Sequence, residues 1–241
     1  MEKVHDQEHD KANCVYQHHF FNNIISSNIN NSQISVFNSY EEDINSFEFS
    51  SYDAFLWTGG LGNIYTSNQH NRDQLIICEK ILKLEKPLWG SCWGLQVVAT
   101  CFGDTIKKST KPEFGCSDNI KIIKNHNVYK NKQDTFSAPG HHYDCLESLC
   151  SEFEVISQNN LSIQSIAHKD KNIFCTQYHP ELPYNFIGNL MKYWKKNYLK
   201  SMTEDEFSLL LSKLESLEIE DKYNRKLEIE NWLKFLSNYS L

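Results

Sequence analysis

The stretch P-L-W-G-S-C-W-G-L-Q at residues 87–96 decides how this chain is interpreted. Its first three residues predict a buried strand that Gly90 ends, and the apolar residues from Leu95 to Phe102 predict a helix. Cys92 would then lie on the sharp turn between strand and helix. Glycines at 90 and 94 suit such a turn, because the backbone of a nucleophile there is strained and bulky neighbours would collide.

A cysteine in that position has a chemical use. The amino-terminal end of a helix carries partial positive charge, which favours the thiolate form of Cys92. The backbone amide of Trp93 would point at the same place and could donate a hydrogen bond to an oxyanion. An isolated cysteine is more often a buried structural thiol, and the glycine-flanked turn is what favours a nucleophile here.

A candidate base and its partner lie in C-T-Q-Y-H-P-E-L, residues 175–182. The apolar residues 173–176 predict a strand just before them. Pro180 pushes His179 towards an extended conformation, in which residues two apart share a face. Glu181 could therefore orient the imidazole of His179 towards a thiol, which predicts a Cys-His-Glu triad.

A glycine-rich turn, W-T-G-G-L-G at residues 57–62, follows another predicted strand. Its small residues let a backbone amide approach a ligand, and Gly60 is the candidate for a second oxyanion donor. A dinucleotide-binding loop is excluded, because the third glycine of that motif would fall at Tyr65. A plain glycine turn is the alternative.

Strand-like and helix-like segments alternate along the chain, which predicts an α/β fold with a mainly parallel sheet covered on both faces. The segment 120–156 has fewer helix signals, and we expect it to add antiparallel strands. The predicted strands are 34–37, 54–57, 87–89, 120–123, 153–156 and 173–176, and the predicted helices are 15–25, 75–84, 95–102 and 183–199.

The last forty or so residues differ in character, so we expect one domain over residues 1–200 and a helical extension over 201–241. T-E-D-E at 203–206 is a capping box, and two amphipathic helices follow it as a hairpin. Such a hairpin either closes the core or offers a surface for a partner or for self-association.

Composition narrows the function classes. A net charge of −7, with both signs interspersed, argues against a nucleic-acid partner. Eight cysteines without a C-x-x-C pair are typical of reduced thiols in the cytoplasm. We see neither a signal peptide nor a membrane span. Ten histidines, some in H-D-Q-E-H-D (5–10) and H-H-F-F (18–21), lack the ligand spacing of a metal site, and we expect neither metal nor cofactor.

These motifs resemble a known family. G-S-C-W-G-L-Q (90–96), Y-H-P-E (178–181) and T-G-G (58–60) are similar to the signatures of class I glutamine amidotransferases, in the family's order and at roughly its spacing. The resemblance spans about residues 35–197 and is strongest to stand-alone proteins related to the glutaminase domain of GMP synthase. E-I-E-N-W-L near the end also resembles the closing segment of that group.

The resemblance implies a flavodoxin-like three-layer sandwich and hydrolysis of glutamine through a γ-glutamyl thioester on Cys92. His179 would transfer protons, Glu181 would orient it, and the amides of Gly60 and Trp93 would bind the oxyanion. A-P-G-H-H-Y-D (138–144) resembles the family's substrate loop. By resemblance, the substrate-binding residues would be Gly59, Gln96, His142 and Tyr143, with Asp144 a weaker match; a polar loop pair is the alternative for His141 and His142.

The sequence also departs from the family. M-E-K-V-H-D-Q-E-H-D at the start shows no apolar first strand, and G-G-L-G replaces the common G-G-P-G. Three functions therefore stay open: a glutaminase that supplies a separate ammonia-accepting synthetase, a γ-glutamyl peptide or conjugate hydrolase with the same triad, and a non-catalytic binding protein.

Overall fold

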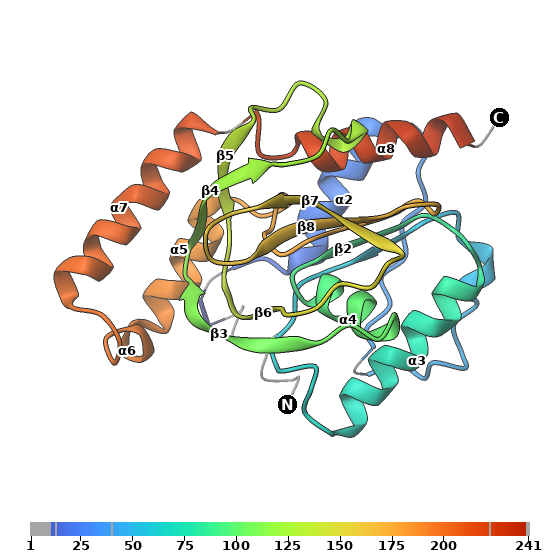
Figure 1. Ribbon diagram of the computed structural model, residues 1–241, viewed down its shortest axis with the longest axis horizontal. Coiled ribbons are helices and arrows are strands. Elements are labelled where there is room, and N and C mark those ends of the chain that lie inside the picture. The colour runs from blue at the N-terminus through green and yellow to red at the C-terminus, as the bar shows by residue number, and fades with distance from the viewer. Residues whose placement is uncertain (1–10, 13, 40, 222, 240–241) are drawn as a thin grey trace.

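The structure is a computed structural model that describes residues 11–12, 14–39, 41–221 and 223–239 (Figure 1). The first-strand question raised by residues 1–10 lies outside the described residues, as does the H-D-Q-E-H-D stretch. No helix among the described residues is both long and apolar enough to cross a membrane.

A seven-stranded sheet forms the centre of the described part of the chain (Figure 1). Parallel pairing joins β1 to β2 and β2 to β9, and every later pairing in the sheet is antiparallel. The sheet is therefore mixed, with two parallel and four antiparallel pairings, where the sequence predicted a mainly parallel one. The antiparallel strands expected in segment 120–156 are therefore present. In spatial order the strands are β1 (Phe55–Trp57), β2 (Leu88–Ser91), β9 (Ile173–Thr176), β8 (Ile163–His168), β7 (Phe153–Gln158), β4 (Cys116–Ile122) and β5 (Thr135–Pro139).

A separate antiparallel ribbon of β3 (Ile106–Glu113) and β6 (His142–Leu146) lies beside this sheet. The sequence patterns gave no range for β3, β5, β6 or β8, although antiparallel strands were expected in the segment that holds β5 and β6. In β3, most of the eight residues are Lys, Ser, Thr or Glu, so the strand lacks the apolar alternation that identifies a half-buried strand. Pairing with β6, not a local apolar pattern, holds it extended.

Helices cover both faces of the sheet, so the predicted α/β sandwich is confirmed (Figure 1). α3 (Gln69–Lys83) and α4 (Trp93–Cys101) lie on one face, and α2 (Gln17–Asn28) and α8 (Leu227–Tyr239) lie on the other. A third group packs at the antiparallel end: α5 (Tyr184–Tyr193), α6 (Lys195–Tyr198) and α7 (Glu204–Glu220). Two short helical turns, η1 (Phe49–Ser51) and η2 (Asn127–Tyr129), also belong to the described part of the chain.

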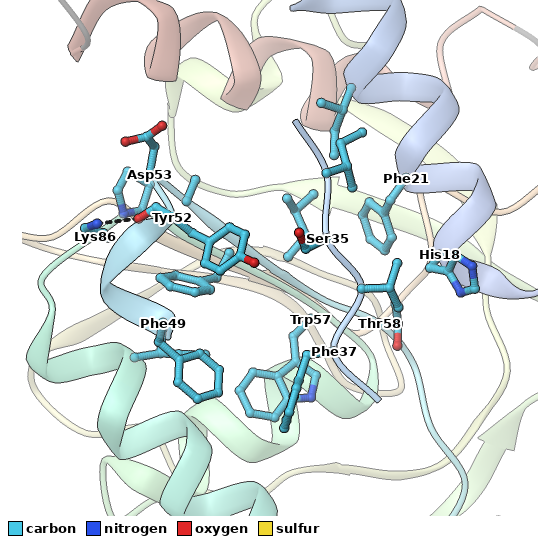
Figure 2. Close-up of a pocket in the computed structure, with 18 of the residues that line it drawn as sticks. His18, Phe21, Ser35, Phe37, Phe49, Tyr52, Asp53, Trp57, Thr58 and Lys86 are labelled. Carbon is cyan, nitrogen blue, oxygen red and sulfur yellow. Dashed lines mark hydrogen bonds between the residues drawn. The ribbon is translucent and has the colours of Figure 1, made fainter. Parts of the chain in front are cut away.

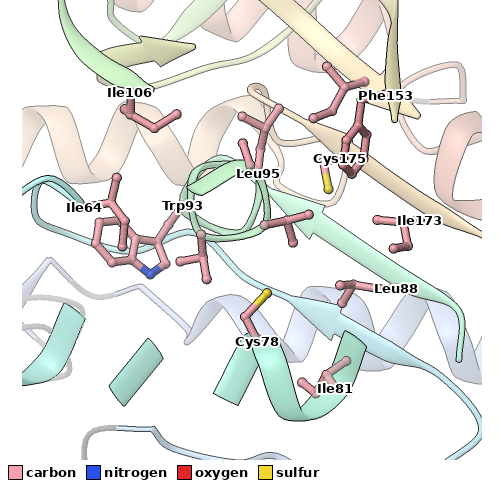
Figure 3. Close-up of a cluster of buried hydrophobic side chains, with 14 of the residues drawn as sticks. Ile64, Cys78, Ile81, Leu88, Trp93, Leu95, Ile106, Phe153, Ile173 and Cys175 are labelled. Atoms are coloured by element: carbon pink, nitrogen blue, oxygen red, sulfur yellow. The ribbon is translucent and has the colours of Figure 1, made fainter. Parts of the chain in front are cut away.

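Successive side chains of β2 and β9 point alternately into two hydrophobic cores. Leu88 of β2 and Cys175 of β9 point into the cluster under α3 and α4 (Figure 3), whereas Trp89 and Phe174 point into the cluster under α2 and α8. This is the period-two geometry of a strand, and it explains why both strands carry apolar residues on each face. β2 and β9 therefore cannot slip in register without moving both cores.

Two sequence predictions were wrong in detail. The strand predicted at 34–37 is not formed: Ile34 and Val36 are 36% and 46% exposed, and no described strand pairs with them. The helix predicted at 183–199 is interrupted at Trp194, whose φ and ψ of −93° and 18° end α5 before α6 begins. An apolar pattern cannot reveal a one-residue break, because the same face stays buried on both sides.

Both predicted C-terminal helices are present. The capping box is formed, with the Glu206 amide donating to the Thr203 hydroxyl at 3.2 Å and the Thr203 amide donating to the Glu206 carboxylate at 2.7 Å. α7 packs against α5, while α8 packs against α2 and η2 (Figure 1). The two helices thus join different cores instead of packing on each other as the predicted hairpin, and a domain boundary at residue 200 stays a prediction.

The approach of α4 to β1 can be tested at Gly94. A β-carbon there would lie 2.8 Å from the Trp57 β-carbon and 2.9 Å from the Trp57 carbonyl oxygen. We expect Gly94→Ala to lower the free energy of unfolding by about 1–3 kcal/mol, because overpacking strains both elements. Urea unfolding measures the change, and a variant as stable as the parent would contradict this packing.

Gly188→Ala in α5 is the matched control. Its added β-carbon would meet nothing closer than Leu214 at 3.8 Å. Alanine should therefore fit there and stabilise the protein by roughly 0.5–1 kcal/mol, since glycine is the weaker helix former.

Candidate active site

Cys92 lies on the sharp turn between β2 and α4, which confirms the strand–cysteine–helix order. Its φ of 50° and ψ of −96° are strained for a non-glycine residue and cost about 1–3 kcal/mol. The turn is held by a hydrogen bond of 2.7 Å from the Cys92 amide to the Thr176 carbonyl at the end of β9. This bond ties the cysteine to the segment that carries His179.

The flanking glycines have the predicted steric reason. A β-carbon on Gly90 would lie 2.8 Å from the Gly94 carbonyl carbon and 3.1 Å from the Cys175 sulfur. Only a glycine therefore lets β2 end directly beneath the first turn of α4.

His179 and Glu181 form a buried pair at the end of β9. The Nδ1 atom of His179 lies 2.7 Å from Oε1 of Glu181, and their side chains are 5% and 0% exposed. The backbone amide of His179 also donates to the Pro139 carbonyl at 2.7 Å, which fixes the loop against β5. Glu181 therefore holds one imidazole nitrogen, as the i, i+2 spacing predicted.

The second carboxylate oxygen of Glu181 has a partner that sequence reasoning missed. The Ser91 hydroxyl donates to Oε2 at 2.9 Å and accepts from the Trp89 indole at 3.0 Å. Both residues belong to the stretch that decides the fold, but no spacing rule distinguishes them from ordinary strand residues.

The charge state of His179 follows from its neighbours. Burial acts to lower the pKa of the imidazole, but the Glu181 carboxylate and the hydrogen bond and charge of Cys92 outweigh it and raise that pKa to about 10. The folded protein thus favours an imidazolium between a carboxylate and a sulfur at neutral pH. Cys92 and His179 lie close enough to interact.

Gln177 is a second neighbour of the sulfur that the sequence did not reveal. Its side-chain amide lies 3.6 Å from Sγ of Cys92, and the residue is fully buried. Its position two residues before His179, at the end of β9, is the signal that could have identified it.

The predicted oxyanion donors lie together. Trp93 is the first residue of α4, where a backbone amide has no carbonyl partner within the helix. A β-carbon on Gly60 would lie 3.0 Å from Cγ of Trp93, so the two residues are neighbours. Gly59 lies against His179, because a β-carbon there would fall 2.5 Å from Cε1 of the ring.

The predicted substrate residues divide into two groups. Gln96 is buried one turn after Cys92 in α4, and its backbone amide donates to the Cys92 carbonyl at 3.2 Å. His142 lies elsewhere: its ring nitrogens are 2.9 Å from the Asp144 carbonyl and 3.1 Å from the Glu113 carboxylate. A role for His142 in binding substrate stays a prediction, and would require one of these bonds to be exchanged.

The residues beside His142 have their own partners. Tyr143 is 47% exposed and packs edge-on against Phe114. The Asp144 carboxylate accepts hydrogen bonds from Asn63 at 2.6 Å and Tyr65 at 3.1 Å, which links β6 to the loop after β1.

Burial lowers the pKa of His141 to about 3, and this ring accordingly stays neutral beside the Tyr198 hydroxyl.

One large cavity is separate from the sulfur. It has a volume of about 1760 Å³ and lies between α2, the irregular residues 29–39, η1 and β1 (Figure 2). Aromatic side chains that include Phe37, Tyr52 and Trp57 line it, and it reaches Gly59 and Gly60 but not Cys92.

The described residues contain no group of three or more His, Cys, Asp or Glu side chains arranged to hold a metal.

Comparison with known proteins identifies relatives. Residues 14–188 match the family described as glutamine amidotransferase class-I. The chain is 27% identical over 175 residues to a GMP synthase (glutamine-hydrolyzing) of Fusobacterium nucleatum, covering 67% of this chain and 33% of that protein. A GMP synthase of the same description from Finegoldia magna is 30% identical over 145 residues, covering 60% and 27%. The chain thus spans about a third of the length of the curated relatives it matches.

Solved structures share the fold. A glutamine amidotransferase from Thermotoga maritima has a TM-score of 0.62 at 19% identity, covering 81% of this chain and 80% of that one. A glutamine amidotransferase from Methylobacillus flagellatus has a TM-score of 0.66 at 14% identity, covering 89% and 88%. These likenesses concern the fold alone, and they confirm the flavodoxin-like sandwich.

The buried pair makes a testable electrostatic prediction. In Glu181→Gln the carboxylate charge is lost, so burial, the largest single influence on the pKa of His179, is no longer opposed by that charge. We expect the pKa of His179 to fall from about 10 towards or below the ordinary 6.5, as measured by NMR of the imidazole carbon-bound protons. The pKa of His126, at the start of η2, should not change in the same spectra. A His179 pKa that stays near 10 in the variant would show that another group holds the proton.

Proposed function

This chain belongs to the class I glutamine amidotransferase family, and we propose that it hydrolyses the side-chain amide of glutamine through a γ-glutamyl thioester on Cys92. The observation that carries the proposal is the meeting of Cys92, a charged His179 and Glu181 at one end of the sheet. Relatives described as glutamine-hydrolyzing favour glutamine over a γ-glutamyl peptide as substrate.

In the first half of the reaction, the Cys92 sulfur attacks the amide carbon of glutamine and a tetrahedral intermediate forms. The imidazolium of His179 gives its proton to the departing nitrogen, the carbon–nitrogen bond breaks, and ammonia leaves. The raised pKa of His179 supports this role, since the acid must hold its proton until the leaving group needs it.

In the second half, neutral His179 removes a proton from water, which attacks the thioester carbon. The carbon–sulfur bond breaks, glutamate leaves, and the sulfur and the imidazolium return to their starting charges. Glu181 keeps Nδ1 of His179 occupied throughout, so that the other ring nitrogen faces the sulfur.

The negative oxygen of each intermediate would be bound by the backbone amides of Gly60 and Trp93, whose adjacency supports this assignment. Gly59 and Gln96 would contact the substrate. Gly59 lies next to Gly60 and against His179, and Gln96 lies one helical turn after Cys92. Tyr143 and His142 would contribute only if the β6 end of the site rearranges around the amino-acid part of glutamine.

We further propose that the ammonia passes to a separate synthetase. The relatives are GMP synthases, and the match covers only 33% and 27% of their lengths. The rest of each relative lies outside the match, and we propose that a separate protein supplies that part. The eight free cysteines support a cytoplasmic location. Self-association through the C-terminal helices stays a prediction, and Leu209 and Ile219 of α7, 73% and 80% exposed, are the residues to test.

Replacement of the nucleophile tests the proposal directly. We expect Cys92→Ala to lower glutaminase kcat at least about 1,000-fold while the fold is retained, because no thioester can form. Glu181→Gln should be less severe than His179→Ala, since Glu181 orients the ring but transfers no proton. Glutamate release from glutamine, assayed alone and with co-purifying proteins, measures the rates.

Cys101→Ala is the matched control, because Cys101 also belongs to α4 and its half-buried thiol contacts the Leu75 carbonyl instead of the site. It should keep the parent rate and the parent labelling of Cys92 by diazo-oxo-norleucine. A Cys92→Ala protein with more than a few per cent of the parent rate would refute the mechanism.

A further inference from the structure

We propose that α8 positions the His179–Glu181 pair, through two chains of buried contacts that begin at its Trp232 and Glu228. The inference rests on the proposed function, because it takes His179 and Glu181 as the groups that act on Cys92. It gives the C-terminal helix a part in the chemistry, although the contacts of its described residues lie away from the sulfur.

The first chain of contacts reaches the carboxylate. Trp232 packs edge-on against Trp89, with ring centroids 5.8 Å apart and planes 65° apart. The Trp89 indole then donates to Ser91 at 3.0 Å, and Ser91 donates to Glu181 at 2.9 Å. All four of these side chains are essentially inaccessible to solvent.

This chain fixes the rotation of the carboxylate. Because Oε1 of Glu181 accepts from His179 and Oε2 accepts from Ser91, the group cannot turn without leaving one buried oxygen unpaired. The Ser91 hydroxyl has its own orientation set by the Trp89 indole. Displacement of Trp89 would therefore loosen the contact that aims the imidazole.

The second chain reaches the backbone next to His179. The Tyr178 hydroxyl donates to Glu228 at 2.9 Å, and Glu228 forms a buried ion pair of 2.7 Å with Lys132. The Tyr129 hydroxyl lies 2.8 Å from the Tyr178 hydroxyl and joins them to the middle of the sheet. Tyr178 is thus held from α8 immediately before the residue whose ring must meet the sulfur.

Other contacts explain why α8 stays docked. Asn231 donates to the carbonyls of Val128 and Lys130 at 3.0 and 2.9 Å, and the Trp232 indole donates to Asn172 at 3.0 Å. Within E-I-E-N-W-L, five of the six residues are buried, and Glu230 alone is partly exposed. This segment therefore packs in the interior of the protein and does not form a surface for a partner.

The test uses the full chain and two variants, Ser91→Ala and Trp232→Phe. The first removes the hydroxyl that holds Glu181, and the second weakens the contact that holds Trp89 while keeping an aromatic ring. Two readouts are measured: the rate at which iodoacetamide alkylates Cys92, followed by mass spectrometry at neutral pH, and kcat per site that diazo-oxo-norleucine labels.

We expect Ser91→Ala to lower kcat per labelled site about tenfold or more with little change in KM, because a small misplacement of a reacting group has a large effect on rate. Alkylation of Cys92 should also slow several-fold, since a loosely held imidazole meets the sulfur less often in the geometry that assists its attack. Trp232→Phe should give a smaller change in the same direction, and it keeps the proposal testable if Ser91→Ala fails to fold.

Asn231→Ala is the control for stability. It removes two buried hydrogen bonds of α8 that lead away from Glu181, so it should lower the melting temperature while leaving kcat per labelled site unchanged. Ser91→Ala and Trp232→Phe proteins whose kcat and Cys92 alkylation both equal the parent values would overturn the proposal.

The two readouts separate this inference from the proposed function. If the parent hydrolyses no glutamine but Ser91→Ala still slows alkylation of Cys92, the positioning role stands and the glutaminase assignment falls. If the parent is an active glutaminase and the variants match it in both readouts, the assignment stands and the positioning role falls.

Discussion

The hydrogen bond from the Cys92 amide to the Thr176 carbonyl is the contact on which the site depends. It closes the parallel pair of β2 and β9 at its carboxyl end, and so joins two segments more than eighty positions apart. Ligands of open α/β sheets bind at this edge because the loops leaving parallel strands meet there. Without that pairing, the Cys92 sulfur and the His179 imidazole would not be held close together.

A buried charge pair is costly unless every polar atom has a partner. Here the His179 imidazolium faces Glu181, and the far oxygen of that carboxylate is satisfied by Ser91. His179 therefore keeps its proton inside the protein, although burial acts to lower its pKa. The same enclosure keeps the strength of the interaction high, because little water screens it.

The antiparallel half of the sheet and the C-terminal helices support this edge from outside. α3 and α4 bury one face of β2 and β9, and α2 and α8 bury the other, so the turn after each strand is fixed by two cores at once. On the β1 side the packing is looser, and the irregular residues 29–39 border a large cavity that ends at Gly59 and Gly60 (Figure 2). The site is thus closely packed on the side of the sulfur and borders a cavity on the side of the glycine loop.

The sequence by itself determined the α/β class, the strand–cysteine–helix turn and the His-Pro-Glu spacing, because each depends on neighbours only a few residues apart. It also indicated both C-terminal helices through a capping box and apolar periodicity. Only the tertiary structure decided which polar residues complete the site. Ser91 and Glu228 carry no local signal, since their partners are 90 and 50 positions away in the chain. The tertiary structure likewise decided which segments form strands. The polar segment β3 pairs with β6, whereas no described strand pairs with residues 34–37.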